Sequence, residues 1–229
     1  MHKKLVIVVG LLSVGISGYA AETKAPVKIE DKKTVLKDGP LTLEQVKNLQ
    51  DNLRAYDAVY IKFSQSIFKN LRKKTITNQG EAYFKKPDKF RWVLTAPNAE
   101  EWVFDGEDLL NYFPGKNEAI RYGAKATKGR NLRELVDIIL NFKQLLAKYK
   151  LDAANKKGDL VVLQLTPLEA SDVEKIEVDM GIQVKFIKTL KMSFKGGNTT
   201  TLSFLEPSFK VFPEDKFSLA KSIKITNAL

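Results

Sequence analysis

Side chains that commonly act as nucleophiles, bases or metal ligands are scarce in this sequence. The chain of 229 residues contains no cysteine, and its one histidine is His2. His2 lies in a segment that we expect to be cleaved off, so the remaining chain has neither residue type. This excludes serine-histidine-aspartate and cysteine-histidine catalysis, ordinary zinc sites and any disulfide in that chain.

A cluster of carboxylates is the remaining candidate for chemistry. It surrounds the Asp105-Gly106 turn and consists of Glu100, Glu101, Asp105, Glu107 and Asp108. Such residues could supply a glycosidase-like pair or bind calcium. Acidic residues are common beside tight turns for backbone reasons, however, and no calcium-loop spacing occurs. No phosphate-binding glycine motif is present either. We therefore expect no enzyme activity, no metal and no cofactor.

Apolar side chains are left as the candidate binding surface. Two runs rich in aromatic and branched residues, 90–94 and 102–104, are each bounded by turn formers, which is typical of antiparallel strands. A concave apolar face can bind acyl chains, because each buried methylene contributes about 0.8 kcal/mol and needs no fixed polar partner. The candidate lining residues are Ile61, Phe63, Phe84, Phe90, Trp92, Leu94, Trp102, Phe104, Leu135, Ile139 and Phe142. For each of them, an ordinary place in a packed core is the alternative.

Alternating apolar residues predict the strands that must position this surface. About ten or eleven strands follow one another with short connections, which favours a single twisted antiparallel sheet. The tail, residues 217–225, can add an edge strand, and Gly80 marks a bulge or the close approach of another group. The expected strands are 59–67, 75–84, 90–94, 102–104, 109–113, 118–122, 151–154, 160–166, 176–180, 186–194 and 199–204.

Helical periodicity interrupts this pattern twice. Residues 41–56 carry apolar side chains at helical spacing, and Thr42 with Gln45 has the spacing of a capping box. Residues 131–149 form a wider apolar stripe that suits a helix lying over an apolar concavity. Gly123, Gly129 and the polar residues 125–130 precede this second helix and predict a hinge.

The N-terminal residues indicate export. A positive start and a short apolar run predict a signal peptide over residues 1–20, cleaved after Ala20. Residues 21–40 are charged and lack apolar periodicity, so we expect a flexible leader before one domain at 41–229. The formal charge of +11 favours acidic partners or an anionic membrane surface, with simple solubility as the alternative. Because the chain is expected to be exported, we expect no nucleic-acid partner.

One motif resembles a known family. Gly80, Lys86-Pro87, Phe90-Arg91-Trp92, Pro97, Asp105-Gly106, Leu109, Tyr112 and Pro114 stand at the spacing of the LolA family signature. The resemblance implies a mainly β fold with helices, in which a single antiparallel sheet forms an unclosed half β-barrel with a helical lid over a hydrophobic cavity. It also implies a periplasmic chaperone that acts as a monomer and binds the acyl chains of lipoproteins. Its implied partners are an inner-membrane lipoprotein-releasing ABC transporter and an outer-membrane lipoprotein receptor.

The resemblance also concerns the closed state of the lid. The family usually has an arginine where this chain has Lys86, and that arginine is associated with hydrogen bonds to the lid. We therefore take Lys86 as a candidate latch, with Arg91 as a residue that can replace it; a solvated surface charge is the alternative. A lipid- or lipoprotein-sensing module of the same fold is the alternative to a carrier.

Overall fold

The computed structural model describes residues 36–52, 56–96, 99–123, 130–205 and 207–228. They belong to one compact unit that begins at Leu36. The predicted signal peptide, most of the predicted leader and residues 124–129 of the predicted hinge lie outside the described residues. None of the described helices is long and apolar enough to cross a membrane.

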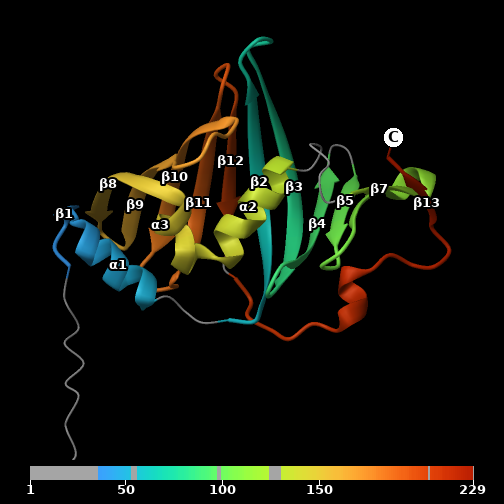
Figure 1. The fold of residues 1–229 in the computed structure, drawn as a ribbon, viewed down its shortest axis with the longest axis horizontal. Coiled ribbons are helices and arrows are strands. Elements are labelled where there is room, and N and C mark those ends of the chain that lie inside the picture. Colours follow the sequence, from blue (N-terminus) through green and yellow to red (C-terminus); the bar gives the residue numbers. More distant parts are fainter. Residues whose placement is uncertain (1–35, 53–55, 97–98, 124–129, 206, 229) are drawn as a thin grey trace, which may run out of the picture. The chain divides into compact units, whose positions relative to one another are not determined.

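Thirteen strands in the described part of the chain form one sheet, in the order β1-β8-β9-β10-β11-β12-β2-β3-β4-β5-β6-β7-β13 (Figure 1). The order does not return to its start, so the sheet is unclosed. The described strands pair antiparallel, apart from the parallel pair β7 and β13. The strands are β1 Gly39–Pro40, β2 Ala58–Lys69, β3 Lys74–Lys85, β4 Lys89–Ala96, β5 Glu100–Phe104, β6 Leu109–Phe113, β7 Glu118–Tyr122, β8 Tyr149–Lys157, β9 Leu160–Pro167, β10 Val173–Gly181, β11 Phe186–Phe194, β12 Thr199–Phe204 and β13 Lys224–Asn227.

All eleven strands expected from alternation are present, which confirms the predicted fold class. The tail strand is β13, shorter than the predicted 217–225 and displaced toward the C-terminus. The sheet also contains β1, which falls inside the segment predicted as leader. Gly39 and Pro40 pair with Lys156 and Asn155 of β8, so regular structure starts two residues before the expected boundary at Leu41.

The register separates two faces of the sheet. Ile61 of β2 pairs with Ala82 of β3, which pairs with Trp92 of β4, so these side chains share one face. We call it the inner face, and its apolar side chains form the main core together with those of the helices. The opposite, outer face carries Tyr83 and its partner Arg91.

Gly80 shows why β3 needs a residue without a side chain at its middle. The β3 and β4 pairing shifts register between Gln79 and Gly80, as expected for a bulge. A Cβ atom on Gly80 would lie 2.1 Å from the carbonyl oxygen of Val93 and 2.6 Å from the Phe63 ring. Both predicted reasons for this glycine, a bulge and a close approach, are therefore confirmed.

The first helix, α1 Leu43–Asp51, begins as predicted and ends earlier than predicted. The Thr42 hydroxyl accepts a hydrogen bond from the backbone N–H of Gln45, and the Gln45 side chain accepts one from the backbone N–H of Thr42. This reciprocal pair is the expected capping box. The helix stops at Asp51, whereas its apolar spacing suggested residue 56.

The segment predicted as a single helix over 131–149 is divided into three parts. They are α2 Arg130–Leu140, the 3-10 turn η2 Phe142–Gln144 and the short helix α3 Leu145–Lys148. The break is at Asn141, whose side-chain amide donates to Asp137 Oδ1 at 2.7 Å and whose carbonyl accepts from the N–H of Gln144. The second bond joins residues three apart, as in a 3-10 turn, so the helical hydrogen-bond pattern changes at Asn141. Tyr149, expected in the helix, starts β8 instead.

These helical parts lie across the inner face, with β2, β3 and the strands β9 to β12 behind them (Figure 1). The chain after β12 crosses the outer face instead. Ser208 bridges to Tyr60 of β2, and the turn η3 Glu214–Phe217 packs on β4. Phe217 is buried there, while Lys85 and Lys89 both form ion pairs with Glu214. The two faces are thus covered by different parts of the chain.

Candidate functional site

The predicted lining residues gather on the inner face as a group. Eight are buried: Ile61, Phe63, Phe84, Phe90, Trp92, Leu135, Ile139 and Phe142. The other three, Leu94, Trp102 and Phe104, are partly buried and pack against the same core. Their rings contact one another, since the Phe63 and Trp92 centroids are 4.0 Å apart and those of Phe90 and Phe104 are 5.9 Å apart. The structure therefore joins the eight strand residues in one apolar layer, and Leu135, Ile139 and Phe142 pack over it from α2 and η2.

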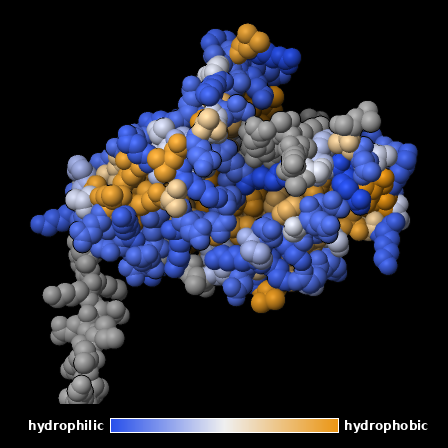
Figure 2. All heavy atoms as spheres, in the orientation of Figure 1, coloured by the Kyte–Doolittle hydropathy of each residue, from blue (hydrophilic) through white to orange (hydrophobic). Residues whose placement is uncertain are grey.

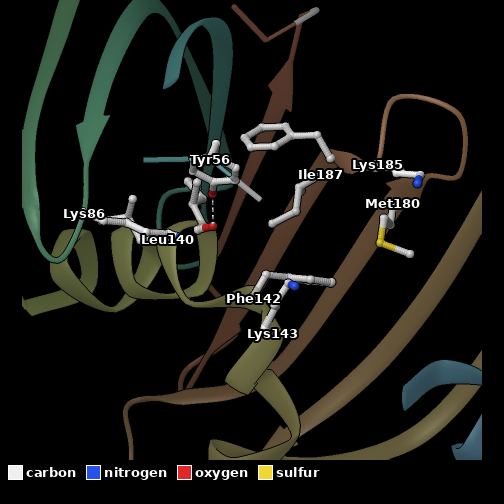
Figure 3. A pocket seen from close by; sticks show the side chains of 10 residues that line it. Tyr56, Lys86, Leu140, Phe142, Lys143, Met180, Lys185 and Ile187 are labelled. Atoms are coloured by element: carbon white, nitrogen blue, oxygen red, sulfur yellow. Dashed lines mark hydrogen bonds between the residues drawn. The ribbon is translucent and has the colours of Figure 1, made fainter. Parts of the chain in front are cut away.

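Side chains of α2 and η2 fill much of the space over this layer. Val136, Ile138 and Ile139 of α2 are each less than 5% exposed. Beside the C-terminal end of α2 a pocket of about 30 Å³ remains, lined among others by Tyr56, Ile139, Phe142 and Phe186 (Figure 3). This volume holds about one water molecule and no acyl chain. With α2 in this position the helix itself occupies the apolar concavity.

Hydrogen bonds connect the C-terminal end of α2 and the turn η2, which together we call the lid, to other elements. The last carbonyl groups of a helix lack partners within the helix and must find them elsewhere. The Tyr56 hydroxyl donates to the carbonyl oxygen of Ile139 at 2.7 Å (Figure 3). Gln50 Nε2 donates to the carbonyl oxygen of Phe142 at 3.1 Å. Burial raises the pKa of Tyr56, so the phenol stays a donor. These polar contacts accompany the apolar packing at the C-terminal end of α2.

Another hydrogen bond holds α2 nearer its N-terminal end. The Tyr149 hydroxyl at the start of β8 donates to Glu134 Oε1 of α2 at 3.0 Å. Burial, and then the Glu134 carboxylate, raise the pKa of Tyr149. Asp137 of α2 in turn forms an ion pair with Lys148 at 2.5 Å. These contacts hold α2 to the segment that follows it.

Lys86 lies beside the lid, and its contact there is with an aromatic ring. Its ammonium nitrogen is 4.8 Å from the centroid of the Tyr56 ring, a cation-π distance. Its side chain lines the small pocket together with Leu140 (Figure 3). Lys86 therefore contacts the residue that bonds to Ile139.

Arg91 lies on the outer face and cannot act as a latch in this arrangement. Its guanidinium donates to Glu101 Oε2 at 2.5 and 2.9 Å and to the carbonyl oxygen of Lys216 at 3.4 Å. The sheet itself separates Arg91 from α2, because its neighbours Phe90 and Trp92 occupy the inner face. The expectation that Arg91 can replace Lys86 is therefore not met.

A wider opening lies at the other end of α2. A groove of about 450 Å³ runs between Leu132 and Leu135 of α2 and the ends of β2, β11 and β12. Its remaining lining residues are Gln65, Ile67, Lys69, Asp172, Met192, Phe194, Lys195, Asn198 and Thr200. Five of its eleven lining residues are apolar, and the other six are polar or charged. We call it the apolar groove.

The acidic cluster has local structural partners. Asp105 Oδ1 accepts the backbone N–H groups of Glu107 and Asp108, both at 2.9 Å, which closes the turn. Glu101 pairs with Arg91, and Asp108 pairs with Arg121. Among the residues that the structure describes, no three histidine, cysteine or acidic side chains gather in a way that could hold a metal ion.

Comparison with known proteins places this chain in a family. The sequence model described as "Outer membrane lipoprotein carrier protein LolA" matches residues 54–220. The chain belongs to the LolA family. An outer-membrane lipoprotein carrier protein of Chromobacterium violaceum is 28% identical over 137 residues, which cover 57% of this chain and 65% of that relative. One of Yersinia pestis is 27% identical over 124 residues, covering 54% and 58%. The matches thus span less than two thirds of these relatives.

A solved structure resembles the fold of this LolA family member. An uncharacterised conserved protein from Thermus thermophilus aligns with a TM-score of 0.53 and 9% identity, covering 80% of this chain and 99% of that chain. At this identity the likeness concerns the fold alone.

Two parts of the site were missed by the sequence analysis. Tyr56 was counted in the first helix, although it follows that helix and bonds to Ile139, 83 positions away. Ile67 was expected in a strand, but only the fold brings it to a groove with Leu132 and Phe194. Neither contact can be predicted from local sequence patterns, because each joins residues far apart in the chain.

Proposed function

We propose that this chain is a periplasmic carrier that binds the acyl chains of lipoproteins on the inner face of its sheet. In this proposal an inner-membrane lipoprotein-releasing ABC transporter supplies the cargo, and an outer-membrane lipoprotein receptor accepts it. Membership of the LolA family supports the lipoprotein cargo. The observation that carries the proposal is an unclosed sheet with an apolar inner face covered by one short amphipathic helix.

Exchange between lid and cargo follows from the packing. The side chains of Ile138 and Ile139 bury the same apolar layer that an acyl chain would bury. Withdrawal of α2 exposes that layer, and each methylene of an incoming chain contributes about 0.8 kcal/mol on burial. Because one apolar cover replaces another, a long chain can compete with the helix without any specific polar partner. Binding of this kind selects for acyl length and tolerates different attached proteins.

The apolar groove is the proposed way in. It already separates Leu132 and Leu135 from Ile67 and Phe194, so movement of α2 away from β2 widens an existing opening. The eleven predicted lining residues then form the proposed binding surface, with the Tyr56 bond to Ile139 as the contact that must break at the far end.

Native mass spectrometry of protein purified from the periplasm tests the ligand class. We expect a fraction of the protein to carry triacylated protein, and purified carrier to pass it to a receptor in a reconstituted assay. Protein that never carries acylated cargo would contradict the proposal. Cargo that is bound but never transferred would favour the sensing module instead.

A cross-link tests the movement of α2. The chain has no cysteine, so the pair Ile67→Cys and Leu132→Cys on opposite sides of the apolar groove reacts selectively with a short bifunctional reagent. The cross-linked protein should keep its circular dichroism spectrum and lose cargo uptake. Each single cysteine variant treated with the same reagent is the matched control and should take up cargo. Equal uptake by the cross-linked protein would exclude a moving lid.

A further inference from the structure

The most exposed large apolar side chain of the described residues stands at the tip of the β2 and β3 hairpin. Leu71 is 96% exposed and lies in the turn Asn70 to Lys73. Figure 2 shows apolar atoms at the top of the view, where this hairpin ends, surrounded by hydrophilic ones. An isolated exposed leucine needs no explanation, but its neighbours here are unusual.

Cations surround this leucine. They come from the β2 and β3 hairpin and from the adjacent turn between β11 and β12, and all are exposed. They are Lys69, Arg72, Lys73, Lys74 and Lys195. Among the described residues, no carboxylate lies within 4.0 Å of any of these five cations. We call Leu71 and the five cations the basic tip.

Hydrogen bonds join the two turns into one unit. Asn70 Nδ2 donates to the carbonyl oxygen of Gly196 at 3.0 Å, and the backbone N–H of Asn70 donates to Asn198 Oδ1 at 2.9 Å. A Cβ atom on Gly197 would lie 2.8 Å from Asn70 Nδ2, so the close approach requires glycine there. The leucine is therefore presented by a fixed double turn.

We propose that the basic tip docks on an anionic phospholipid surface, with Leu71 entering the interface and the five cations facing the headgroups. Basic residues close to an anionic membrane attract it additively, and an apolar side chain adds burial. A projecting tip with one leucine and no socket around it would bury little area against a folded protein, whereas a bilayer deforms around it. Lys69 and Lys195 also line the apolar groove, so docking brings the groove close to the membrane surface.

Flotation with lipid vesicles tests the proposal directly. The full chain should float with vesicles of phosphatidylethanolamine and phosphatidylglycerol and remain behind with vesicles of phosphatidylcholine. Raising the salt from about 0.1 M to about 1 M shortens the Debye length from ~10 Å to ~3 Å and should release the protein. Equal binding to both vesicle types, or to neither, would overturn the proposal. Binding to a soluble acidic protein without binding to vesicles would overturn it as well.

Variants locate the contact. Arg72→Gln with Lys74→Gln removes two exposed cations of the tip and should weaken binding to anionic vesicles about 25-fold, at about fivefold for each cation. Lys157→Gln with Lys221→Gln removes the same charge elsewhere and should bind as the unchanged protein does. Weaker vesicle binding by the tip variant than by the control variant supports the basic tip as the docking site, whereas equal binding by the two variants excludes it.

Leu71→Ser should weaken binding roughly tenfold, with Val211→Ser, at a position 90% exposed, as the matched control without effect. A Leu71→Ser variant that binds as tightly as the control would show that the leucine does not enter the membrane and would overturn that part of the proposal. The docking is independent of cargo. Protein that fails to dock yet carries acylated protein would contradict the docking proposal and leave the carrier proposal standing. Protein that docks but never carries acylated protein would contradict the carrier proposal alone.

Discussion

The hydroxyl of Tyr56 and the carbonyl oxygen of Ile139 are 2.7 Å apart, although 83 positions separate them in the sequence. The bond joins the segment before β2 to the last turn of α2. It satisfies a carbonyl group that the helix leaves without an internal partner. This single contact therefore reports whether the C-terminal end of the lid is closed.

Removing this hydroxyl should loosen the lid. Tyr56→Phe keeps the ring packing and leaves the buried Ile139 carbonyl without its donor, which should destabilise the closed state by about 1 to 2 kcal/mol. Hydrogen exchange of the amides in residues 132–140 should become faster. Tyr60→Phe, which removes a hydroxyl bonded to Glu81 on the outer face, is the control and should leave that exchange unchanged. Equal exchange in Tyr56→Phe and the unchanged protein would show that this bond does not hold α2.

Lys86→Arg should act in the opposite direction. A guanidinium offers five donors in a rigid fork and stacks on aromatic rings, whereas the ammonium of Lys86 lies over the Tyr56 ring as a point charge. We expect slower amide exchange in residues 132–140 of the empty protein. Because the site is exposed, the closed state should be stabilised by no more than about 1 kcal/mol. Lys89→Arg on the outer face is the matched control. Unaltered protection in Lys86→Arg would leave Lys86 as a surface charge.

Asn111 offers a way to stabilise the sheet. Its side chain is 1% exposed on the inner face, and its Oδ1 atom has no hydrogen-bond partner among the described residues. Replacing a buried unsatisfied amide with an apolar side chain of similar size removes that penalty, so Asn111→Val should raise the free energy of unfolding by about 1 kcal/mol. Urea denaturation measures the change. Asn78→Val removes an amide that donates to Gln65 and should instead be destabilising. A loss of stability in Asn111→Val would indicate a partner for that amide.

The contact of η3 with the sheet should depend on pH. Hydrogen bonds from Lys85, and then Lys89, lower the pKa of Glu214 to about 2 from its ordinary value of 4.5. A lowered folded-state pKa gives stability that is fully present above pH 4.5 and is lost as the pH falls toward 2. The protection factor of the Phe217 amide, which corrects for the pH dependence of intrinsic exchange, should therefore fall over that range. Glu214→Gln should show a low protection factor at every pH, and a pH response of this factor that persists in the variant would assign it to another group.

Most of the fold could be predicted from alternating apolar residues, because this alternation is a local property of the sequence. Each of the eleven expected strands has its inner residues two positions apart, and short turns then determine antiparallel order. The same alternation gives the position of Arg91, since a residue between Phe90 and Trp92 must point to the opposite face. The latch assignment of Arg91 rested on the resemblance and on closeness in sequence, and it conflicts with this parity.

The lid was less accessible from sequence for a different reason. The apolar stripe of residues 131–149 is continuous, so periodicity alone does not reveal the break at Asn141. At that break the backbone of Asn141 leaves helical geometry, and its carbonyl accepts the N–H of Gln144. Contacts such as Tyr56 to Ile139 require the complete chain path, which no local pattern contains.

The ends of the sheet bear on how this protein behaves at high concentration. An unclosed sheet presents backbone donors and acceptors along its outermost strands, where a second chain can add and start a fibre. Here the outermost strands are β1 with two residues, one of them Pro40, and β13 with four residues, starting at Lys224. These two short strands, with a proline and a lysine, offer a poor template for another strand, although β1 covers only Asn155 and Lys156 of β8. The open sheet thereby limits polymerisation through these two strands.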